Sequence, residues 1–206
     1  MNRIAVFFAL VGACLFAREA NATDAAASAR AFERLSTLVG AWEGKFDDGR
    51  RHTVTYRLSA GGSVLVETWA LAPGRESMTL YHRDGDDLVA VHYCPQGTQP
   101  RLKLEKGIEA SASPTASASP TGLRMDFGFD GGSSLHEKGR SHQRSFWLQL
   151  QDDGSYLRSE TYVENGSSAD EIAKAEAGSA IRYTRITAAQ RAGNSARPDD
   201  TDAAPH

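Results

Sequence analysis

The chain has 206 residues and a formal net charge of −3 at pH 7, with 23 basic against 26 acidic side chains. This acidic balance argues against a nucleic-acid-binding protein, because such proteins carry a basic surface. Hydrophobic residues make up 40% of the chain, and there are 2 cysteines. A buried core, rather than a disulfide framework, must therefore hold the fold.

Residues 1–22 have the pattern of an export signal peptide. A polar, positive start precedes an apolar run from Ile4 to Phe16, and Ala20-Asn21-Ala22 provides a small-x-small cleavage site. The apolar run is too short to span a bilayer. Cleavage after Ala22 leaves 21 basic and 25 acidic residues. It also leaves Cys94 as the only thiol, so no intramolecular disulfide can form.

An alternative processing site overlaps the signal. Val11-Gly12-Ala13-Cys14 matches a lipobox, which would leave a lipid on Cys14 and associate the mature protein with a membrane. We favour simple cleavage because the apolar core would be very short if it ended at Cys14.

An Ala-rich segment follows the signal and predicts a short helix. Its large apolar residues fall on one helical face: Phe32, Leu35, Leu38 and Val39. We expect this helix to lie over one end of the domain. Directly after it, Gly40 and Gly44 bracket Trp42 on a strand too short to stand alone. Trp42 must therefore be buried by strands that come later in the chain.

The pattern Gly40-Ala41-Trp42, placed at the first strand after a leading helix, resembles the G-x-W signature of the calycin (lipocalin-like) β-barrels. The resemblance implies that Trp42 closes one end of a barrel and that an arginine from the last strand packs over it. Arg182 and Arg185 are the two candidates for that arginine.

Turn signals containing Gly or Pro recur about every dozen residues after Trp42, which favours an antiparallel meander. These signals are Asp47-Asp48-Gly49, Gly61-Gly62, Pro73-Gly74, Asp84-Gly85, Pro95-Gln96-Gly97, Gly131-Gly132, Asp152-Asp153-Gly154 and Asn165-Gly166. A sheet of about eight to ten strands usually closes. We therefore predict an all-β fold, a single up-and-down antiparallel barrel of about eight to ten strands with an N-terminal helix.

The domain boundaries follow from composition. Residues 23–187 are predicted to form the lipocalin-like barrel domain. Within it, residues 107–121 are predicted to be a flexible insertion, because the Ala/Ser/Pro-rich sequence there has nothing bulky to bury. A short helix is expected within residues 167–177, before the last strand. The polar tail, residues 188–206, is predicted to be disordered.

The apolar residues that alternate along the strands should point into the barrel. We therefore expect an apolar lumen that binds a small hydrophobic or amphipathic ligand. Its candidate lining residues are Tyr56, Leu58, Met125, Phe127 and Phe146. Polar anchoring of the ligand is expected from Glu67, His92 or Arg101, and Trp69 is the remaining candidate ligand-binding residue.

Glu67 and Trp69 share one face of a strand that is otherwise rich in Val and Leu. If that face is interior, the carboxylate is costly unless it is paired, as a ligand-orienting group often is. The alternative, which we favour from the sequence, has Glu67 facing water or pairing with Arg57 on the next strand.

No residue spacing predicts a catalytic or metal site. His92 and Cys94 lie on one strand face about 7 Å apart, which is too far for a nucleophile and its base, so Cys94 is predicted to be a buried thiol. The spacings H-x-H, H-E-x-x-H and C-x-x-C, which are typical of metal ligands, do not occur.

Haem is an alternative cofactor, because nitrobindin-type barrels also begin with a Gly/Trp motif. In that family one histidine late in the barrel holds the haem. The last two predicted strands here, Tyr156 to Val163 and Ser179 to Ile186, contain no histidine. His82 or His92 would have to substitute, and only if it pointed inward.

Two further stretches, Gly61 to Thr68 and His92 to Arg101, together with the G-x-W start look like a group of small exported bacterial lipocalin-like proteins without an assigned function. The resemblance extends from Phe32 to Leu102 and implies a periplasmic or secreted protein. The expected function is ligand binding without catalysis. The alternatives are a haem-binding barrel of nitrobindin type and a packed structural or interaction barrel in the cell envelope.

Overall fold

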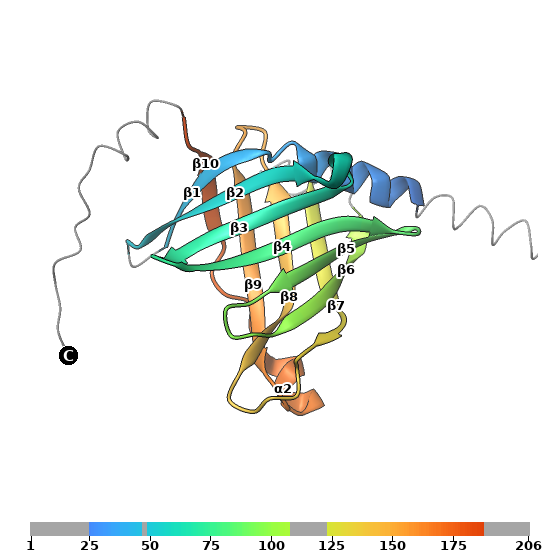
Figure 1. Ribbon diagram of the computed structural model, residues 1–206, viewed down its shortest axis with the longest axis vertical. Coiled ribbons are helices and arrows are strands. Elements are labelled where there is room, and N and C mark those ends of the chain that lie inside the picture. Colours follow the sequence, from blue (N-terminus) through green and yellow to red (C-terminus); the bar gives the residue numbers. More distant parts are fainter. Residues whose placement is uncertain (1–24, 47–48, 108–122, 188–206) are drawn as a thin grey trace, which may run out of the picture.

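The computed structural model describes residues 25–46, 49–107 and 123–187. These residues form a closed antiparallel barrel of ten strands (Figure 1). A helix over residues 25–36 lies at one end, and a short second helix, α2, Ala169–Lys174, lies at the opposite end. The all-β barrel with an N-terminal helix that the sequence predicts is thereby confirmed.

The strands follow one another around the barrel in chain order, and the first strand closes it by pairing with the last. Their bounds are β1 Gly40–Lys45, β2 Arg51–Ser59, β3 Val64–Ala72, β4 Arg75–Asp84, β5 Asp87–Tyr93, β6 Gln99–Gly107, β7 Arg124–Ser133, β8 Ser141–Leu150, β9 Tyr156–Glu164 and β10 Ile181–Arg185. A 3-10 turn, η1, Ala60–Gly62, joins β2 to β3. The predicted turn signals thus mark real hairpins, and the strand number is the upper one predicted.

Three predicted segments fall wholly or largely outside the described residues. These are the signal peptide, the C-terminal tail and the insertion, except for Gly107 at its start, which ends β6. The helix predicted before the last strand is α2, and a capping box begins it. The Ser168 side chain accepts from Glu171 N, and the Ser168 N–H donates to the Glu171 carboxylate at 2.7 Å. Among the described residues, no helix has the length and apolar character needed to cross a membrane.

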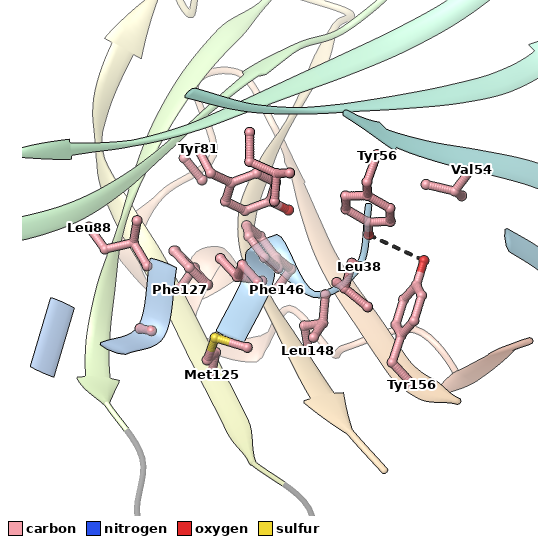
Figure 2. Packing of buried hydrophobic residues seen from close by; sticks show 14 of the residues in the cluster. Leu38, Val54, Tyr56, Tyr81, Leu88, Met125, Phe127, Phe146, Leu148 and Tyr156 are labelled. Atoms are coloured by element: carbon pink, nitrogen blue, oxygen red, sulfur yellow. Dashed lines mark hydrogen bonds between the residues drawn. The ribbon is translucent and has the colours of Figure 1, made fainter. Parts of the chain in front are cut away.

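The N-terminal helix and the turn after it pack against one end of the barrel core. Leu35 and Leu38 are buried, and the Leu38 carbonyl accepts a hydrogen bond of 2.7 Å from Trp42 Nε1. Figure 2 shows Leu38 reaching into the same cluster as Leu148 and Tyr156. Full burial of each such leucine contributes roughly 1.5–3 kcal/mol relative to leaving it exposed. The helix therefore acts as a hydrophobic cap on this end.

Arg185 explains why the first strand begins with glycine. Its guanidinium lies over the Trp42 ring at 4.4 Å and donates to the carbonyls of Val39 at 2.7 Å and Thr37 at 3.0 Å. Gly40 has a φ of 136°, and a Cβ there would overlap the Arg185 guanidinium. The arginine over the tryptophan is therefore present, and the barrel is consistent with a calycin-like architecture.

The barrel wall opens at the opposite end, between β9 and β10. These strands pair at three positions, from Tyr156 opposite Tyr183 to Arg158 opposite Ile181. The ladder ends there because β10 begins at Ile181, and Gly178 N donates to the Glu160 carbonyl at 2.9 Å in the connection that carries α2. The inward face of β9 consequently continues past the last paired residue.

Candidate functional site

A cleft of about 460 Å³ lies where β9 and β10 diverge. One wall is aromatic and apolar, and the other carries the inward-facing charged residues of β9. The lining residues are Phe46, Trp69, Arg158, Ser159, Glu160, Tyr162, Gly178, Ser179, Ala180, Ile181 and Tyr183. A volume of this size is typical of small-molecule sites, which combine apolar walls with a few polar groups.

Glu67 lies directly behind Trp69 and is fully buried in the barrel. Its carboxylate accepts hydrogen bonds from Trp69 Nε1 and from the Tyr81 hydroxyl. Arg158 Nη1, from β9 on the far wall, donates to Glu67 Oε2 at 3.0 Å and to the Tyr81 hydroxyl at 3.0 Å. Three donors therefore converge on one carboxylate, an arrangement that suits the ionised form.

The Arg158 side chain is 1% exposed and also donates from Nε to Glu160 Oε1 at 2.8 Å. Its guanidinium lies between two rings, 4.3 Å from the centre of Phe146 and 5.1 Å from that of Trp69. Arg158 Nη2 is buried and has no hydrogen-bond partner among the described residues. Nη1 and Nε of the guanidinium are therefore hydrogen-bonded, and Nη2 is a donor without a partner among the described residues.

Burial and pairing act in opposite directions on these charges. Burial raises the pKa of Glu67, and the Arg158 charge opposes that rise. Burial on its own would lower the pKa of Arg158, but Glu67, Tyr81 and Glu160 raise it well above its ordinary value. Arg158 is therefore charged at every physiological pH, and the site contains a permanent buried cation.

His52 of β2 supports the aromatic wall. Its ring stacks on the Trp69 ring, with the ring centres 4.8 Å apart and 15° between the ring planes. Its Nε2 lies 2.6 Å from the Tyr183 hydroxyl. Phe46 also packs against the histidine, with the two ring centres 4.7 Å apart. Burial lowers the pKa of His52, so the ring is neutral at pH 7.

His92 of β5 lies across the interior from β9. Its Nδ1 is 3.1 Å from Thr79 Oγ1. Its ring lies edge-on to the Tyr162 ring, with the ring centres 6.4 Å apart. The register places Glu67, Thr79 and His92 side by side on three neighbouring strands. Burial lowers the pKa of His92 from 6.5 to about 4. The polar interior therefore extends from β3 to β5.

Gln143 of β8 completes this polar interior. It is fully buried, and neither its Nε2 nor its Oε1 has a hydrogen-bond partner among the described residues. Gln143 pairs with Tyr162 in the β8–β9 ladder, so both side chains project from the same face of the sheet. Buried polar groups in native proteins almost always have a partner, and these two atoms are available for one.

The apolar residues predicted to line the lumen lie in the packed core instead. Tyr56, Met125, Phe127 and Phe146 are inward-facing, as expected, but they belong to the core cluster beneath the helix and do not line the cleft (Figure 2). Leu58 is 45% exposed near the end of β2, which corrects its assignment to the lumen. Aromatic side chains from opposite walls meet and fill this half of the barrel.

The predicted polar anchors divide into two groups. Glu67 and His92 are inside the barrel, and Glu67 pairs with Arg158, whereas the sequence favoured water or Arg57. Arg101 lies on the outer face, where it pairs with Asp84 at 2.9 Å and Asp130 at 3.3 Å. The outward position follows from its ladder pairing with Val91, whose neighbours Ala90 and His92 point inward.

Trp69 is the one predicted ligand-binding residue that lines the cleft, and the prediction missed most of the others. Among the missed residues, Arg158, Glu160 and Tyr162 follow Tyr156 at every second position of β9. That alternation would have revealed them once Tyr156 was assigned to the core, since every second residue shares its face.

Arg182 and Arg185 were the two candidates to cover Trp42. Arg185 covers it, whereas Arg182 donates to Asp153 at 3.1 Å.

The other chemistries have little geometric support. His92 points inward, but neither it nor His82 lines the cleft, so neither is placed to bind a haem there. Cys94 is a free, half-buried thiol at the end of β5. Within the described ranges, no group of three or more His, Cys, Asp or Glu side chains is arranged to hold a metal ion.

No protein-family model matches the chain, and no curated protein is significantly similar to it.

Proposed function

We propose that this protein binds a small amphipathic molecule in the cleft between β9 and β10. The observation that carries the proposal is the pairing of aromatic walls with a buried polar floor in a volume of about 460 Å³. The apolar part of the ligand would pack on Phe46, Trp69 and Tyr183, and its polar part would reach Arg158. Export from the cytoplasm, as the sequence predicts, would make the protein a periplasmic or secreted carrier.

The construction of the floor supports this proposal. An ion pair buried this deeply is not an efficient way to stabilise a barrel, because well-packed apolar residues would do as well or better. Glu67, Tyr81 and Arg158 instead hold a charged group in one orientation beside an opening in the wall. Such preorganised polar groups reduce the cost of ordering a ligand when it binds.

The experiment uses the neutral fluorophore N-phenyl-1-naphthylamine and two matched variants of the loop before β10. Ala180 is exposed and lines the cleft, whereas Ala177 is exposed in the same loop and does not. Ala180→Trp should fill the opening and weaken saturable binding of the fluorophore at least tenfold. Ala177→Trp should bind it like the wild type. Equal binding by both variants, or no saturable binding by the wild type, would reject the proposal.

A packed structural or interaction barrel remains the second candidate, and one observation favours it. The half of the lumen beneath the N-terminal helix is filled by buried side chains, including Tyr81, Phe127 and Phe146. Native mass spectrometry of the full-length protein separates the two candidates. A co-purified small molecule favours the carrier, whereas an empty barrel with a stoichiometric protein partner favours the interaction barrel.

A further inference from the structure

Arg158, which lines the cleft, has a buried hydrogen-bond donor that no described residue partners. Arg158 Nη1 and Nε are both occupied, by Glu67 with Tyr81 and by Glu160, and Nη2 is the buried atom left over among the described residues. The Arg158 side chain is 1% exposed and lines the cleft. A buried guanidinium N–H without a partner loses the free energy of a charge-assisted hydrogen bond, so a ligand atom that accepts one is strongly favoured here.

The positive charge of Arg158 is already paired with two carboxylates. Glu67 and Glu160 both contact the same guanidinium, at 3.0 Å and 2.8 Å. The group therefore has one positive and two negative formal charges. The neighbouring histidines do not alter this balance, because burial lowers the pKa of both His52 and His92. A third carboxylate at Nη2 would lie within a few ångströms of two others, where like charges repel strongly at a low local dielectric.

We infer that the ligand carries an uncharged, hydrogen-bond-accepting head group, such as an alcohol or an amide, which Arg158 Nη2 contacts, and that the site discriminates against carboxylates. This inference rests on the proposed function and specifies the chemical class of its ligand. The site would thus select neutral amphiphiles over fatty acids, although it contains a buried arginine.

The aromatic wall fits an apolar tail extending from that head. Trp69 stacks on His52, and the ring centres of Trp69 and Tyr183 are 5.9 Å apart. Phe46, which also packs against His52, extends this wall. Glu160, on the opposite wall, retains 21% side-chain exposure and lies at the entry to the polar floor. An incoming carboxylate therefore meets Glu160 before it reaches Arg158.

The first test is a matched panel of three eight-carbon probes, octan-1-ol, octanamide and octanoate, measured by calorimetry with the full-length protein at pH 7.5. Octanol and octanamide should bind at least tenfold more tightly than octanoate. Equal affinities, or a preference for octanoate, would overturn the inference while leaving a carrier of another class. If none of the three binds and the naphthylamine fluorophore also fails, the proposed function itself is wrong. If the fluorophore binds and the three probes do not, the head-group assignment is overturned.

The second test locates the discrimination. Glu160→Gln keeps an oxygen that can accept from Arg158 Nε and removes one negative charge. The ratio of octanoate affinity to octanol affinity should rise at least tenfold in this variant. Glu76→Gln, on an exposed residue at the start of β4, is the matched control and should leave all affinities unchanged. An unchanged octanoate-to-octanol ratio in folded Glu160→Gln would overturn the inference.

Discussion

Arg158 of β9 and Glu67 of β3 form an ion pair of 3.0 Å across the interior of the barrel, with side-chain exposures of 1% and 0%. The two residues are 91 positions apart in the chain, and their strands are not neighbours in the sheet. The pair therefore exists only because the barrel is closed, which brings β3 and β9 to opposite sides of one interior. It also holds the guanidinium beside the cleft.

Breaking this pair on one side should be far more harmful than replacing it. Arg158→Met leaves Glu67 buried without its counter-charge and should cost about 3–5 kcal/mol of unfolding free energy. Glu67→Leu should cost less, because Arg158 keeps its ion pair with Glu160 at 2.8 Å. The double variant should be more stable than the sum of the two losses predicts, because neither charge remains. Urea unfolding of the four proteins measures this coupling, and additive losses would contradict it.

Arg185 should matter more to stability than Arg182, although both lie on β10. Arg185→Ala removes two hydrogen bonds to the carbonyls of Thr37 and Val39 and the contact with the Trp42 ring, so we expect a loss of about 1–3 kcal/mol. Arg182 makes an exposed ion pair, and its replacement by alanine should cost little. Thermal unfolding of both variants tests this order, and equal losses would refute the role of Arg185.

Gly44 should not tolerate a side chain, because the Tyr183 ring lies where a Cβ would be placed. The ideal Cβ would lie 2.5 Å from Tyr183 Cε1. Gly44→Ala should displace that ring, which stacks on Tyr156 at 4.6 Å, and destabilise the protein by about 1–3 kcal/mol. Gly178→Ala is the control, since its nearest neighbour would be 3.5 Å away. Chemical denaturation showing both variants equally stable would refute the prediction.

His92 should make the fold less stable in mild acid. Its pKa is about 4 in the fold, whereas a histidine in the solvated, unfolded chain has a pKa of 6.5. Between these values the unfolded chain binds the proton and the folded protein does not, so the free energy of unfolding falls as pH drops. The full effect is about 3 kcal/mol, since one pKa unit corresponds to about 1.4 kcal/mol.

The pH effect is checked by urea unfolding at pH 7, 5.5 and 4. His92→Gln should lose less stability over this range than the wild type, because its side chain does not titrate. His82 lies on the outward face of β4, so His82→Gln should retain the wild-type dependence. If the two variants show the same slope as the wild type, another group causes the acid sensitivity.

The sequence by itself determined the architecture. The even spacing of glycine and proline turns predicts hairpins, and alternation of apolar residues predicts which strand face is buried, because both are local properties of the backbone. The Gly40 and Trp42 pattern likewise identified the closed end. Glycine is required at position 40 for two reasons. The positive φ is a local reason, and the Arg185 guanidinium, which occupies the place of a Cβ, is a tertiary one.

Only the tertiary structure decided where the barrel is full and where it is open. Alternation assigns Tyr56, Phe127 and Arg158 to the inward face, but it does not say which inward residues meet across the lumen. That depends on the closure of the barrel and on the divergence of β9 from β10, which are long-range features. For this reason residues predicted to line a lumen, such as Tyr56 and Phe127, lie in the packed core. For the same reason Glu67 pairs with Arg158 on the opposite wall and not with Arg57 on the adjacent strand.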